Sequence, residues 1–107
     1  MMGGLILSNI LMLGNYVDGV MKQVTSGISG TYNQGDDVSY WAGGSLENAI
    51  YTATKLLKNP FYQFTDEEKK NLANAIITHG GTAIFNEAIV RGTVYATNGI
   101  FTGEVNA

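Results

Sequence analysis

The most regular alternation of hydrophobic and polar positions in this chain occupies residues 89–107. The motif I-x-x-G-x-V-x-A occurs there twice, beginning at Ile89 and again at Ile100. Successive side chains of a β-strand point to opposite faces, so the alternation predicts two short strands that each have one apolar side. A repeat of this length cannot bury its own apolar side, and it therefore predicts stacking against other strands or other chains.

Two arrangements of this repeat are consistent with the sequence. Asn98-Gly99 at the junction favours a two-residue hairpin turn, because both residues tolerate positive φ. The hairpin pairs Val94 with Gly103, so a large residue faces a small one. A parallel solenoid, in which equivalent residues of the two copies stack, is the alternative. The expected packing or oligomer face consists of Val90, Gly92, Val94, Ala96, Phe101, Gly103 and Val105.

A helical period replaces the strand period in the middle of the chain. Ser45 is a favourable N-cap, apolar positions from Leu46 to Leu57 form one stripe, and Asn59-Pro60 stops the helix. A second helix is predicted after the aromatic linker 61–64. Together the two predict a helical hairpin over residues 45–79.

The second helix of that hairpin rests on three signals. Thr65 and Glu68 have the spacing of a capping box, in which each residue accepts a hydrogen bond from the other's backbone. An apolar face from Leu72 to Ile77 comes next. His79 then suits the negative end of the helix dipole, and Gly80 supplies the left-handed residue that ends a helix.

The N-terminal residues 1–44 are predicted to form β segments. Short apolar runs at Leu5–Leu13 and Val38–Ala42 are separated by Gly-rich and Asn-rich stretches, with Gly14-Asn15 among the expected breaks. The fold class is therefore α+β in a single domain: β segments in 1–44, a helical hairpin in 45–79 and a β-repeat segment in 80–107.

The composition argues against several classes of partner and site. The 107 residues have a net charge of −3, the six basic residues are scattered, and no cysteine is present, so a nucleic-acid groove, a disulfide and a thiolate site are not expected. The run Leu5–Leu13 is far shorter than the roughly 20 residues that span a bilayer, so no membrane insertion is expected.

Candidate chemistry is sparse, and no enzyme activity is expected. His79 is the only histidine and lacks the partners of an acid–base site, which leaves a small enzyme around His79 as the least favoured hypothesis. Asp36-Asp37 does not have the spacing of a calcium loop, and Gly43-Gly44-Ser45 lacks the lysine of a phosphate loop. No metal and no cofactor are predicted.

Aromatic side chains offer the one plausible ligand platform. Aromatic faces stack on sugar rings, although such residues more often fill a core or an interface. The alternative function is thus a carbohydrate- or surface-binding adhesin module. Its possible ligand aromatics are Tyr40, Trp41, Phe61 and Tyr62.

The chain resembles tail-fibre-type structural proteins of phages and bacterial prophages. The resemblance rests on Tyr40-Trp41-Ala42-Gly43-Gly44, on Thr78-His79-Gly80-Gly81 and on the repeat V-Y-A-T-N-G-x-F-T-G-x-V-N-A. It covers residues 38–107. Proteins of that type continue through further tandem repeats, so we expect this chain to be a fragment or a shortened product.

The resemblance implies a non-enzymatic structural component of a host-attachment assembly. It implies a homo-oligomer, with a trimer favoured, that contacts other tail proteins and in some cases a cell-surface glycan. It also implies synthesis in the bacterial cytoplasm and a final location in the virion or outside the cell.

Overall fold

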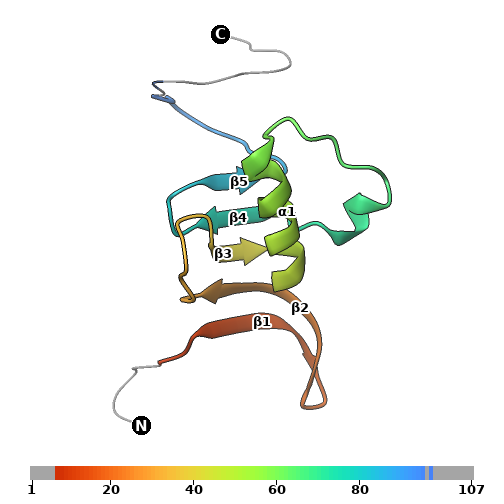
Figure 1. Ribbon diagram of the computed structural model, residues 1–107. Helices are drawn as coiled ribbons and strands as arrows, with labels where there is room; N and C mark the ends of the chain where they lie inside the picture. Colours follow the sequence, from red (N-terminus) through yellow and green to blue (C-terminus); the bar gives the residue numbers. More distant parts are fainter. Residues whose placement is uncertain (1–6, 96, 98–107) are drawn as a thin grey trace.

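The computed structural model describes residues 7–95 and 97, and these form an α+β fold with one antiparallel sheet and one α-helix (Figure 1). The five strands lie in the sheet in the order in which they occur along the chain. The helix comes after the third strand. The elements are β1 (Ile10–Val17), β2 (Val20–Ser29), β3 (Val38–Ala42), α1 (Leu46–Lys58), the 3₁₀ turn η1 (Glu68–Asn71), β4 (Ala75–Thr78) and β5 (Ala83–Phe85).

A tight hairpin joins β1 to β2. Asp18 and Gly19 form its turn with φ of 52° and 79°, the positive pair that a type I′ turn requires. The prediction of a break at Gly14-Asn15 is wrong, because both residues lie inside β1. Gly14 is needed there for a different reason: a Cβ at this position would overlap the Gln23 carbonyl oxygen at a bulge between the two strands.

The predicted strand at Val38–Ala42 and the first predicted helix are both confirmed. The Ser45 hydroxyl accepts a hydrogen bond from the Asn48 amide at 3.1 Å, as an N-cap does. The helix ends at Lys58, before Asn59-Pro60.

The second predicted helix is wrong, and with it the helical hairpin. The capping box forms: the Thr65 amide donates to Glu68 Oε1 at 2.9 Å, and the Glu68 amide donates to Thr65 Oγ1 at 3.2 Å. Only the four-residue turn η1 comes after it. The β-branched pair Ile76-Ile77 instead lies in β4, between β3 and β5. Partners on both sides of the strand outweigh a short helix signal at residues that favour strands.

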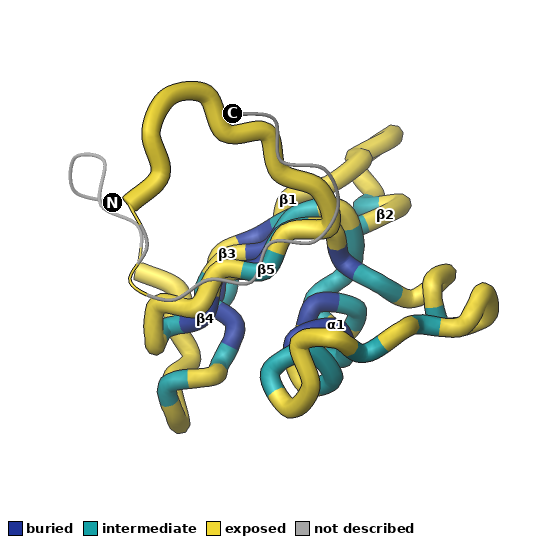
Figure 2. The backbone as a smooth tube through the Cα atoms, turned by 90° about the horizontal axis from the view of Figure 1, so that it is seen from above, coloured by how far each residue is buried: buried dark blue, intermediate teal, exposed yellow. Residues whose placement is uncertain are grey.

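The core lies between α1 and one side of the sheet (Figure 2). Trp41 is fully buried at its centre, and the indole Nε1 donates to the Gly44 carbonyl at 3.0 Å. The indole covers Gly27 on the neighbouring strand, where any Cβ would overlap the ring. The other buried apolar residues are Val38, Ala49, Ala53, Ala73 and Ile76.

The described residues after β5 form no further strand. Ile89 and Tyr95 are 93% and 94% exposed, and Val90 and Val94 are exposed as well. The expected strand over residues 90–95 is therefore absent from the described part of this segment. The hairpin through Asn98-Gly99, together with Ala96, Phe101, Gly103 and Val105, lies outside the described residues.

Candidate functional site

Within the described residues, α1 covers only one side of the sheet (Figure 2). The positions on the other side follow from the strand register. Leu11 pairs with Ile28, Ile28 with Tyr40, and Tyr40 with Ile77, so these four side chains form one row across four strands. A second row runs two residues away along each strand. We call this surface the open face. It consists of Leu11, Leu13, Ser26, Ile28, Tyr40, Ala42, Ala75, Ile77, Ala83 and Phe85.

The open face is apolar and carries no charge. Its large side chains are 39% to 53% exposed, with Ile77 and Phe85 at the two limits. The polar side-chain groups on the open face are the hydroxyls of Ser26 and Tyr40. Monomeric proteins rarely expose apolar patches this continuous, and such patches mark contact surfaces for other molecules.

The aromatic residues proposed as a ligand platform are not brought together. Trp41 is in the core, while Tyr40, its neighbour along β3, is 40% exposed on the open face. Phe61 and Tyr62 lie in the segment after α1. A flat platform that contains Trp41 is therefore excluded by the burial of its ring.

His79 lies directly after β4, so the prediction that it ends a helix is wrong. Its ring Nε2 is 3.0 Å from the Ser29 carbonyl oxygen, and the Tyr32 ring meets it edge-on with centroids 5.3 Å apart. Its backbone amide donates to the Asp37 carbonyl. Gly81 rather than Gly80 has the positive φ, at 95°, within the turn from β4 to β5. These contacts join the end of β4 to the end of β2 and to the segment before β3.

Glu68 is the centre of the most connected polar cluster in the described residues. Its Oε2 accepts hydrogen bonds from the Tyr51 and Tyr62 hydroxyls at 2.7 and 2.9 Å. The capping bond from the Thr65 amide, followed by the bonds from the two tyrosine hydroxyls, lowers the pKa of Glu68 to about 2. The same carboxylate raises the pKa of Tyr51 to about 12.

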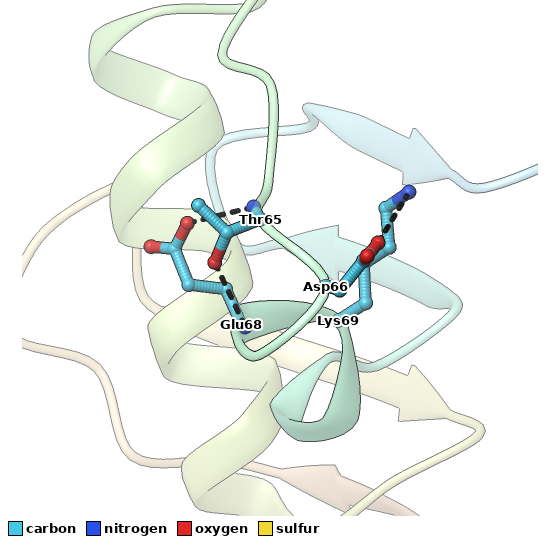
Figure 3. A network of polar contacts seen from close by, with 4 residues as sticks. All are labelled: Thr65, Asp66, Glu68 and Lys69. Carbon is cyan, nitrogen blue, oxygen red and sulfur yellow. Dashed lines mark hydrogen bonds and ion pairs between the residues drawn. The ribbon is translucent and has the colours of Figure 1, made fainter.

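Figure 3 shows the Thr65–Glu68 capping pair, with Asp66 and Lys69 forming an exposed ion pair of 3.9 Å beside it. The Glu68 carboxylate accepts hydrogen bonds from Tyr51 on α1 and from Tyr62 and Thr65 in the segment after α1. The cluster thus fixes the segment after α1 against the helix.

A groove of about 580 Å³ lies between α1 and the segment before β3. Leu46, Ile50 and Leu57 supply its apolar wall, and Asp36 and Asp37 lie at its polar side. The Asp37 carboxylate accepts hydrogen bonds from the Asn33 and Gln34 amides, and these bonds lower its pKa. The Asp37 carboxylate therefore stabilises the turn over residues 33–37.

The residues of the open face were missed at the sequence level, Tyr40 excepted. Leu11 lies within an apolar run, but Ile28 falls in the Gly-rich stretch from Gly27 to Gly35, which the sequence predicts to be a break between strands. Ile77 was assigned to a helix. The Asp18-Gly19 pair is the sequence signal that could have revealed this surface, because Asp-Gly favours a hairpin turn and so predicts a strand after it. That strand is β2, which places Ile28 beside Leu11.

Comparisons with known proteins add no relative. No family model, no curated protein and no solved structure matches this chain. Within residues 7–95 and 97, no cluster of His, Cys, Asp and Glu has the geometry to hold a metal ion. In the same part of the chain, no helix is both long enough and apolar enough to cross a membrane.

Proposed function

We propose that this chain is a non-enzymatic structural subunit of a phage or prophage tail-fibre-like assembly, and that it assembles with copies of itself through the open face. The uncharged apolar surface of the sheet carries this proposal. The resemblance of residues 38–107 to tail-fibre-type proteins supplies the kind of assembly, with other tail proteins and a cell-surface glycan as further partners.

A second copy is the occupant that fits this surface best. Two open faces brought together about a symmetry axis meet without like charges, because neither has a charge. Sheets pack face to face at about 10 Å with their apolar side chains interdigitated. The exposed Ile28, Tyr40 and Ile77 would then be removed from water, as Trp41 already is on the other side.

The test is the mass in solution, measured by light scattering over a range of concentrations. The unchanged chain is expected to be oligomeric. Ile28→Glu places a charge in the open face and is expected to shift the mass towards the monomer. Ile50→Glu is the matched control, because Ile50 is 50% exposed on α1 and Ile28 is 51% exposed on the sheet.

Three results would contradict the proposal. A monomer for the unchanged chain at all concentrations would remove the reason for a contact surface. An Ile28→Glu variant that stays oligomeric would move the contact elsewhere. Equal loss of assembly in Ile50→Glu would show that the two substitutions act through general destabilisation.

A further inference from the structure

Strand β1 forms an edge of the sheet, and it lacks two features that often protect an edge, namely charged side chains and proline, although its pairing with β2 has two register irregularities. It is eight residues long, and none of them is charged or a proline. All of its residues after Ile10 are exposed. An edge of this kind offers a row of backbone donors and acceptors to another strand. By contrast, the opposite edge, β5, has only three residues.

The direction of the free backbone groups follows from one hydrogen bond. The Gly30 amide donates to the Asn9 carbonyl at 2.7 Å, so Asn9 directs its backbone groups towards β2. Backbone groups alternate in direction along a strand. Ile10, Met12, Gly14 and Tyr16 therefore direct their amides and carbonyls away from β2, at the outer edge.

We infer that β1 pairs antiparallel with β1 of a second copy, about a two-fold axis at Leu13. This inference rests on the proposed function and names the contact that joins the first two subunits. The pairing joins two five-stranded sheets into one continuous sheet, and it places both open faces on the same side. A larger apolar surface then becomes available for the face-to-face packing of further copies.

Side-chain size selects this register. With the axis at Leu13, Met12 faces Gly14 and Ile10 faces Tyr16 in hydrogen-bonded pairs, so a large side chain covers a glycine. A shift that places the axis at Gly14 would set two glycines against each other and leave a gap between the strands. Close packing of cross-strand neighbours favours the first arrangement.

A cysteine cross-link tests the register, because the chain has no cysteine of its own. Leu13 meets its own copy in a pair without mutual hydrogen bonds, where Cα atoms lie about 4.5 Å apart and a disulfide can form. Leu13→Cys is expected to yield a disulfide-linked dimer as its main product under mild oxidation. Val20→Cys is the control: Val20 is 52% exposed, Leu13 is 51% exposed, and Val20 lies outside the β1 edge.

The outcomes separate this inference from the proposed function. A linked dimer for Leu13→Cys, with Val20→Cys at background, supports the edge pairing. An oligomer of the unchanged chain without the Leu13→Cys link overturns the edge pairing and leaves the open-face proposal standing. A trimeric mass also overturns it, because a two-fold contact builds even-numbered assemblies. A monomer at all concentrations overturns both.

Discussion

The two sides of the sheet differ in what covers them, and Tyr40 and Trp41 show the difference within two residues of one strand. Trp41 is fully buried under α1 with its indole N–H bonded, whereas Tyr40 is 40% exposed on the other side. Both sides are apolar. The helix α1 of the same chain covers the side that carries Trp41, and it does not cover the side that carries Tyr40.

The largest expected effect is the difference in stability between variants of Trp41 and Tyr40. Trp41→Ala removes the centre of the covered side and is expected to lower the free energy of unfolding by about 3–5 kcal/mol. Tyr40→Ala is expected to cost about 1 kcal/mol or less in a dilute sample, because its side chain has no covering layer there. Urea denaturation of both variants measures the difference. Equal costs would mean that the open face is covered within a single chain.

A smaller effect is expected at two neighbouring positions of β2. Gly27→Ala places a methyl group against the Trp41 indole and is expected to destabilise by about 1–3 kcal/mol through overpacking. Ser26→Ala, on the open face, changes a residue of similar size and should be close to neutral. Thermal unfolding of the pair provides the measurement. A tolerated Gly27→Ala would contradict the packing of the indole on this glycine.

The smallest expected effect concerns pH on the covered side, where Glu68 holds the segment after α1. Its pKa falls from 4.5 to about 2 on folding, so its contribution to stability is present above pH 4.5 and is lost as the pH falls towards 2. The pKa of Tyr51 rises from 10 to about 12, so its contribution is lost as the pH rises through that range.

Glu68→Gln is expected to flatten the acid dependence of unfolding between pH 4.5 and 2. Glu67→Gln is the matched control, since the Glu67 carboxylate contacts only the exposed Lys70 ammonium at 3.3 Å. Circular dichroism during acid titration monitors both variants. If Glu67→Gln flattened the curve as much as Glu68→Gln, the hydrogen bonds from the Thr65 amide and the two tyrosine hydroxyls to Glu68 would not be the cause.

Local signals predicted α1 and β3 well, because their determinants lie within a few residues. Ser45, the apolar stripe and Asn59-Pro60 are enough to begin and end a helix. The capping box at Thr65 was also correct, but a cap specifies only the first turn of a helix. The conformation of the residues after that turn depends on β3 and β5, which offer β4 backbone partners on both sides. Neither strand could be inferred to pair there from the residues around Thr65 alone.

The open face could not be predicted from alternation within single segments. Leu11, Ile28 and Ile77 come from three strands, and only the cross-strand register places them in one row. The absence of charge on this side becomes visible only when that row is assembled. By contrast, the alternation that was clearest in the sequence, at Val90–Val94, corresponds to exposed and unpaired chain.

The most direct test of the central claim is hydroxyl-radical footprinting of Tyr40 at low and high protein concentration, with Phe61 as an internal reference. Phe61 is 58% exposed in the segment after α1, away from the open face. If copies meet through the open face, oxidation of Tyr40 will slow as the concentration rises, while that of Phe61 will stay constant. An oxidation rate of Tyr40 that does not change with concentration would contradict the claim.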